Sequence, residues 1–110
     1  MPRVTRVTYA PGAMRDLERL RDFLAAHDPE AVLIAAQRIV DAISTLERHS
    51  LIGRPVDMGM RELVISRGRT GYVALYDFLD IIDTVVILAV RHQREAGFDY
   101  MGGPILGDRE

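Results

Sequence analysis

The chain has 110 residues, 48% of them hydrophobic and 27% charged, and a formal net charge of -2 at pH 7. This size and composition are typical of one folded domain and exclude a disordered or low-complexity chain. The small negative charge argues against a general nucleic-acid coat, because non-specific binding to phosphates needs a clear cationic surplus. The chain has no cysteine, which excludes disulfides and thiolate metal sites.

Nothing in the sequence indicates secretion or membrane insertion. Residues 1–5 lack the apolar run of a signal peptide, and no uninterrupted apolar stretch approaches the roughly 20 residues that span a bilayer. We therefore expect a cytoplasmic protein that has no membrane partner.

The first half of the chain predicts one strand and two helices. Residues 3–9 are rich in β-branched side chains and stop at a Pro-Gly pair, which indicates a first strand with an edge position as one option. Residues 13–26 carry apolar side chains at three-and-four spacing and predict an amphipathic helix. The Asp-Pro-Glu run at 28–30 supplies an N-cap acceptor and a proline at the first helical position, so a second helix begins there.

The second half predicts three strands. A break around residues 49–55 ends the second helix, and a loop runs to about Met60. Residues 61–67 and 72–79 flank a short glycine-bearing connector, which is typical of an antiparallel hairpin. Residues 84–90 are apolar on both faces, as expected of a central strand.

These elements predict an α+β fold in one small domain, with an N-terminal strand, a helical hairpin and a three-stranded antiparallel β-meander. No repeat or shift in composition indicates a second domain. We expect the domain to span residues 1–100 and residues 101–110 to form a flexible tail.

Several short motifs, taken in order, resemble one known family. They are Tyr9-Ala10-Pro11 with Ala13 and Asp16-Leu17, Gly53-Arg54-Pro55-Val56, Arg61-Glu62-Leu63, Gly71-Tyr72-Val73-Ala74-Leu75-Tyr76, and the run from Ile87 to Phe98. The sharpest parts are Gly-Arg-Pro, the tyrosine-rich third strand and the Arg-His-Gln-Arg-Glu that begins at Arg91. On these motifs the chain resembles the ParE branch of the ParE/RelE toxin superfamily, whose β-αα-βββ order agrees with the order predicted from periodicity.

This resemblance implies a bacterial or plasmid-borne toxin that is held inactive by a cognate antitoxin, with which it forms a hetero-oligomer. In the ParE branch it implies DNA gyrase as the target, inhibited by binding and not by an enzymatic reaction. We therefore expect a non-enzymatic inhibitor without direct sequence-specific binding to nucleic acid. A different reading is a toxin fold that is retained only as an antitoxin-binding module, since the sequence does not report toxicity.

The candidate target-binding segment follows the last predicted strand. Its members are Arg91, His92, Gln93, Arg94, Glu95 and Phe98. A rigid strand delivers these side chains to the end of the sheet, which is a suitable place for recognition. The alternative is a solvated strand end with ordinary ion pairs, each worth about 0 to 1 kcal/mol.

His92 raises the alternative of catalysis, because the histidine side chain is a common general base in enzymes. RelE-type ribonucleases resemble this fold and imply a ribosome-dependent mRNA interferase with Arg91, His92 and Tyr100 as participants. Those enzymes use several basic side chains, including an arginine on the third strand. Val73 stands about where that arginine is expected and the chain has no lysine, which weakens charge stabilisation of a cleavage reaction.

The candidate antitoxin contacts are Leu33, Val40, Tyr72, Tyr76, Arg61 and Arg67. The first two widen the apolar stripe of the second helix beyond what packing on one sheet requires. The two tyrosines share one face of a strand and suit either an interface or the edge of the core. The two arginines belong to a segment with a net positive charge, which suits either an acidic partner or a solvated hairpin.

No cofactor or metal site is expected. The histidines at 27, 49 and 92 lack metal-ligand spacing, and the glycine-bearing segment 68–71 lacks the P-loop pattern. The serines belong to no recognisable nucleophile motif, so the sequence does not support a hydrolase.

Overall fold

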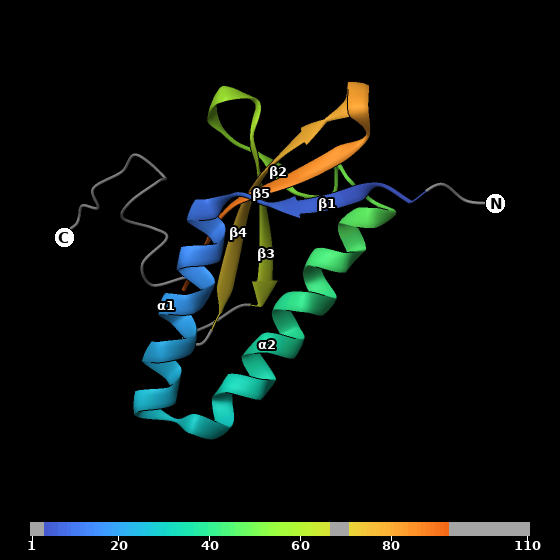
Figure 1. Cartoon of the computed structure of the whole chain (residues 1–110). Helices are drawn as coiled ribbons and strands as arrows, with labels where there is room; N and C mark the ends of the chain where they lie inside the picture. Colours follow the sequence, from blue (N-terminus) through green and yellow to red (C-terminus); the bar gives the residue numbers. More distant parts are fainter. Residues whose placement is uncertain (1–3, 67–70, 93–110) are drawn as a thin grey trace.

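A five-stranded sheet with two helices on one face makes up the described part of the protein (Figure 1). The computed structural model describes residues 4–66 and 71–92. The elements in chain order are β1 (Arg6–Tyr9), α1 (Pro11–His27), α2 (Pro29–Ser44), β2 (Arg54–Pro55), β3 (Arg61–Ser66), β4 (Tyr72–Leu79) and β5 (Thr84–His92). The predicted tail and residues 93–98 of the predicted target-binding segment lie outside the described residues.

The strand order in the sheet is β1-β5-β4-β3-β2. β1 pairs with β5 in parallel, from Arg6 opposite Thr84 to Tyr9 opposite Ile87, and the other neighbouring strands are antiparallel. A parallel pair needs a long connection, which here includes both helices and the rest of the meander. The expected α+β order is confirmed, with β1 at one edge and β5 inside the sheet.

Prolines set the start of both helices. Pro11 and Pro29 lie at the beginning of α1 and α2, where a backbone N–H would have no intrahelical acceptor. Asp28 separates the two helices, and its N–H donates to the Leu24 carbonyl oxygen at 2.6 Å at the end of α1. Because Pro29 begins α2 directly afterwards, the chain turns back at once and the helices form the predicted hairpin.

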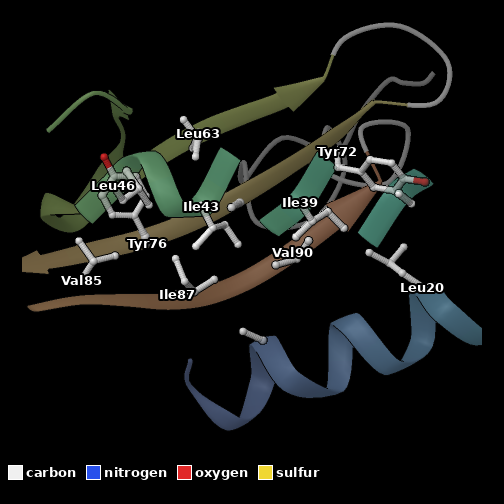
Figure 2. Close-up of a cluster of buried hydrophobic side chains, with 13 residues drawn as sticks. Leu20, Ile39, Ile43, Leu46, Leu63, Tyr72, Tyr76, Val85, Ile87 and Val90 are labelled. Carbon is white, nitrogen blue, oxygen red and sulfur yellow. The ribbon is translucent and has the colours of Figure 1, made fainter. Parts of the chain in front are cut away.

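The core lies between the sheet and the helical hairpin (Figure 2). Side chains point into it at three-and-four spacing from the helices and at alternating positions from the strands. Its buried members include Ala13, Leu20, Ile39, Ile43, Leu46, Leu63, Tyr72, Ala74, Tyr76, Val85, Ile87 and Val90. Removal of this apolar surface from water, at about 25 cal/mol per Å², is the main term that holds the helices on the sheet.

Tyr76 ties the core to the turn before β2. Its buried hydroxyl accepts a hydrogen bond from the Gly53 N–H at 2.9 Å and donates one to the Ser50 carbonyl oxygen at 2.8 Å. A Cβ on Gly53 would lie 2.6 Å from the tyrosine ring, so only glycine fits at this position. Arg61 holds the same turn by donating to the carbonyl oxygens of Leu51 and Gly53. The Gly-Arg-Pro motif therefore begins with a packing contact.

The structure adds one strand to those expected from the sequence and places the side chains of several candidate antitoxin contacts. The loop expected before Met60 contains β2, whose two residues pair with β3 but are too few to give a periodic signal. Tyr72 and Tyr76, both candidate antitoxin contacts, are buried core residues that are 4% and 0% exposed, and Tyr76 uses its hydroxyl internally. Arg61, another candidate contact, directs its guanidinium to the turn at 51–53.

Replacement of Tyr76 by phenylalanine tests the contact with this turn. Tyr76→Phe keeps the ring but leaves the Gly53 N–H and the Ser50 carbonyl without this partner, so we expect the free energy of unfolding to fall by about 1 to 3 kcal/mol. Urea denaturation measures the change. Tyr9→Phe, at a side chain that is 37% exposed, should change it by less than about 0.5 kcal/mol. Equal losses in the two variants would contradict the internal role of the Tyr76 hydroxyl.

Because the hydroxyl of Tyr76 is buried, we also expect the protein to lose stability at alkaline pH. Burial raises the pKa of Tyr76 above its ordinary value of 10.0, while the Gly53 amide and the charge of Arg61 lower it to a smaller extent. As pH rises past the ordinary value, the unfolded chain therefore loses the phenolic proton before the folded protein does, and the free energy of unfolding decreases. Urea denaturation between about pH 10 and pH 11 should show a shallower decline for Tyr76→Phe than for the parent protein. Identical slopes would rule out this titration as a contribution.

Candidate functional site

A cavity of about 410 Å³ opens between α1, α2 and the sheet, and we call it the interhelical groove. Its lining residues are Met14, Leu17, Glu18, Leu20, Arg21 and Leu24 from α1, Val32, Ala35, Ala36, Ile39 and Val40 from α2, and Tyr9 and Tyr72 from the strands. Glu18 and Arg21 are its charged members, and most of the others are apolar. Such a lining suits the apolar face of a protein segment better than a small polar ligand.

The groove continues into exposed apolar surface on both helices. Met14 and Val40, which line it, are 48% and 57% exposed. Leu33, two helical turns before Val40, is 78% exposed. Clustered apolar exposure on a small domain typically marks a surface for a partner. The excess apolar surface expected on the second helix is therefore present, and its use as an antitoxin contact stays a prediction.

The second feature is the end of β5, which extends beyond its partner β1. Their pairing ends at Ile87, and α1 lies along the edge that follows. The Asp16 carboxylate accepts a hydrogen bond from the Val90 N–H at 3.0 Å and lies 3.4 Å from the Nε atom of Arg91. The side chain of Arg91 is 28% exposed. Arg91 is thus tied back to α1, as the ion-pair alternative from the sequence anticipates.

Tyr72 and His92 meet where β4 begins and β5 ends. They are partners in the strand register, and their rings lie edge to face with centroids 5.4 Å apart. Val73 is the register partner of Arg91 and is 3% exposed. A buried apolar side chain therefore lies beside Arg91, at the position where a RelE-like reaction is expected to use a cation.

Tyr72 connects the interhelical groove to this strand end. Its side chain lines the groove and also contacts the ring of His92. Burial raises the pKa of Tyr72 above its ordinary value, and the charge of Arg38 lowers it to a smaller extent. The hydroxyl therefore stays protonated at neutral pH, so it is available both to donate and to accept a hydrogen bond. Figure 2 shows Tyr72 and Tyr76 at opposite ends of the core.

The structure divides the predicted site residues into three groups. Leu33, Val40 and Tyr72 lie at or near the groove. Arg91 and His92 lie at the end of β5. Arg61 and Tyr76 lie beside the turn at 51–53. The other predicted members, Arg67, Gln93, Arg94, Glu95 and Phe98, fall outside the described residues.

No residue of α1 was predicted to belong to a functional site. Its apolar stripe predicts a core position for Met14 and Leu17, whereas both also line the groove. Asp16 belongs to a motif of the family resemblance but carries no predicted role. Its hydrogen-bond partner lies 74 residues further along the chain, so no local pattern indicates the contact.

Neither a metal site nor a membrane span is found in the part of the chain that the structure describes. No three histidine, aspartate or glutamate side chains within residues 4–66 and 71–92 come together in a way that could hold a metal ion. Neither described helix combines the length and the hydropathy that a membrane crossing needs.

Comparison with known sequences identifies relatives over nearly the whole domain. The profile of the family described as "ParE toxin of type II toxin-antitoxin system, parDE" matches residues 7–97. The chain is 39% identical to the Caulobacter vibrioides protein named Toxin RelE3 over 89 residues, which cover 81% of this chain and 95% of the relative. The profile match includes the helical hairpin and the strands from β2 to β5.

Two solved structures resemble the fold. One, from the chromosomal ParDE toxin–antitoxin system of P. aeruginosa, has a TM-score of 0.68 and 24% identity, and the match covers 81% of this chain and 96% of that one. The other, from the RelBE2 toxin–antitoxin complex of Mycobacterium tuberculosis, has a TM-score of 0.56 and 28% identity, and the match covers 82% and 99%. These likenesses agree with the predicted fold class.

Proposed function

Given that this chain belongs to the ParE toxin family and is a type II toxin of the ParE/RelE superfamily, we propose that it inhibits DNA gyrase by binding and that a cognate antitoxin occupies its interhelical groove. One observation carries the proposal. The apolar interhelical groove and the arginine-bearing end of β5 lie on either side of Tyr72, so that each can bind a different partner. Binding, and not catalysis, is the activity that this arrangement favours.

The groove supports the antitoxin part of the proposal. An amphipathic antitoxin helix that folds on the groove would bury the exposed surface of Met14 and Val40 with anchors one helical turn apart. Glu18 and Arg21 offer charges of both signs that would set its orientation. The ParDE neighbour is named as part of a toxin–antitoxin system, and the RelBE2 neighbour is named as part of a toxin–antitoxin complex.

The end of β5 supports the target part. The segment 91–98 continues from a strand that is anchored in the core by Val85, Ile87 and Val90, so its first residues have a rigid base. Arginine presents planar donors that match carboxylates and phosphates. Because Arg91 already lies beside Asp16, Arg94 is our first choice for the cation that contacts the target.

A ribosome-dependent mRNA interferase is the second candidate. The relative named RelE3 and the RelBE2 neighbour favour it, as does the presence of Arg91 and His92 together at the strand end, with Tyr100 as a third participant. The buried Val73 beside Arg91 and the absence of lysine from the chain count against it, since a cleavage reaction needs stabilisation of negative charge.

Aspartate substitution on α2 tests the antitoxin surface. Val40→Asp places a charge on the groove wall and should weaken antitoxin binding at least about thirtyfold, because the charge would lose its water without gaining a partner. Ile34→Asp is the matched control, since Ile34 is 55% exposed on the same helix but does not line the groove. Calorimetry with the purified antitoxin measures both dissociation constants. An unchanged constant for Val40→Asp would remove the groove from the interface.

A supercoiling assay tests the target. Purified chain, free of antitoxin, should block gyrase from supercoiling relaxed plasmid and should trap linear cleaved DNA. Normal supercoiling by folded, growth-inhibiting protein would instead favour the mRNA interferase, which primer extension on ribosome-bound messages would detect. Induction without harm to growth would leave the antitoxin-binding module as the function.

Arginine substitution tests the target-binding segment. Arg94→Ala should weaken gyrase inhibition about tenfold, the usual scale for loss of one charged contact, and should leave antitoxin affinity unchanged. Arg48→Ala is the control, because Arg48 is exposed near the end of the second helix and outside the groove. Dose–response curves in the supercoiling assay compare them. Equal potency of Arg94→Ala and Arg48→Ala would exclude Arg94 as a target contact.

A further inference from the structure

The end of β5 presents an unusual edge. From Leu88 onward no residue of β1 pairs with it, so backbone groups on this side need partners from elsewhere. The first turn of α1 runs close against this edge, because a Cβ on Gly12 would lie 3.4 Å from the Leu88 carbonyl oxygen. One turn later, Asp16 supplies a side-chain acceptor for the Val90 N–H. The Asp16 carboxylate thus supplies the hydrogen-bond acceptor that a neighbouring strand supplies elsewhere in the sheet.

The Asp16 carboxylate accepts one backbone hydrogen bond and lies within ion-pair distance of two arginines, whose contacts are too long or too poorly aligned to be hydrogen bonds. Its Oδ2 atom lies 3.0 Å from the Val90 nitrogen and 3.4 Å from Nε of Arg91, and its Oδ1 atom lies 3.7 Å from an Nη atom of Arg19. The Asp16 side chain is 13% exposed, whereas those of Arg91 and Arg19 are 28% and 44% exposed. A carboxylate that is mostly out of water and engaged by a backbone donor and two cations has little freedom to move.

We propose that Asp16 is a positioning residue for the target-binding segment. It fixes the backbone at Val90 and the guanidinium of Arg91, and thereby sets the direction in which the chain leaves β5 at His92. This inference rests on the proposed function, because it assigns Asp16 to the segment that we expect to contact the target. Asp16 itself does not contact the target.

The alternative is that Asp16 only helps to fasten α1 to the sheet. Apolar contacts already perform that task, because Ala13 and Leu20 of α1 are buried in the core. The Asp16 hydrogen bond and its shortest ion contact go to consecutive residues at the end of β5. Loss of Asp16 should therefore loosen the strand end locally and leave the groove intact, whereas loss of a general fastening would weaken the fold and antitoxin binding together.

Two substitutions separate the hydrogen bond from the charge. Asp16→Asn keeps a side-chain oxygen that accepts the Val90 N–H but removes the attraction for Arg91 and Arg19. Asp16→Ala removes both. Asp22→Asn is the matched control, since Asp22 is an exposed carboxylate on the same helix that pairs with Arg21 at 3.2 Å.

Amide hydrogen exchange of the purified full-length chain tests the positioning directly. We expect the Val90 amide to exchange at least about tenfold faster in Asp16→Ala, less so in Asp16→Asn, and at the parent rate in Asp22→Asn, while core amides of β4 keep their protection. An unchanged Val90 rate in Asp16→Ala would overturn the proposal, and so would uniform acceleration across the sheet. This result does not depend on the identity of the target.

Potency and antitoxin affinity supply the functional readout. Asp16→Asn should need about tenfold more protein for equal gyrase inhibition, with antitoxin affinity within about twofold of the parent and an unchanged melting temperature. Full potency in Asp16→Ala, or a parallel loss of antitoxin affinity and melting temperature, would refute positioning. If the parent chain leaves gyrase untouched, the proposed target fails, and growth inhibition by the same variants then replaces the gyrase readout.

Discussion

The parallel pairing of β1 with β5 is the constraint on which the rest of the structure depends. It ends at Tyr9 opposite Ile87, and the next residue, Ala10, donates its N–H to the Ile87 carbonyl oxygen at 2.9 Å. Pro11 then begins α1. Because β1 ends beside Ile87, α1 begins next to β5, and its first turn lies against the edge of β5 that β1 leaves unpaired. The interhelical groove and the end of β5 both depend on this placement of α1, because α1 forms one wall of the groove and its Asp16 contacts the end of β5.

The exposed apolar surface is a consequence of the helical hairpin. A two-helix layer on a sheet needs one apolar stripe per helix, and Leu20, Ile39 and Ile43 meet that need. Met14 and Val40 lie beyond this stripe and stay about half exposed, which weakens solubility without stabilising the fold. Surface of this kind is what the proposed antitoxin would cover, and the RelBE2 protein of Mycobacterium tuberculosis is itself named as part of a toxin–antitoxin complex.

Local patterns predict most of the fold, whereas contacts between distant residues could not be predicted. Periodicity and the prolines at 11 and 29 are sufficient for the helical hairpin, because spacing and caps act within a few residues. The short strand β2 leaves no such pattern. Tyr76 shows the same alternating sequence pattern whether its face of the strand is buried or exposed. Its contacts with the turn at residues 50–53, which is distant in sequence, show that it is buried. The contact of Asp16 could not be predicted either. An acidic residue on a helix is expected to be solvated unless its partner on a distant strand is known.

The groove and the strand end are not independent surfaces. Leu17 lines the groove while its neighbour Asp16 holds Val90, and Tyr72 lines the groove while its ring contacts His92. The groove and the end of β5 thus share α1 and Tyr72 as common contacts. By thermodynamic linkage, any free energy by which a groove ligand alters target binding equals that by which the target alters binding of the ligand. If the antitoxin occupies the groove as proposed, α1 and Tyr72 are therefore the elements through which it would be coupled to the end of β5.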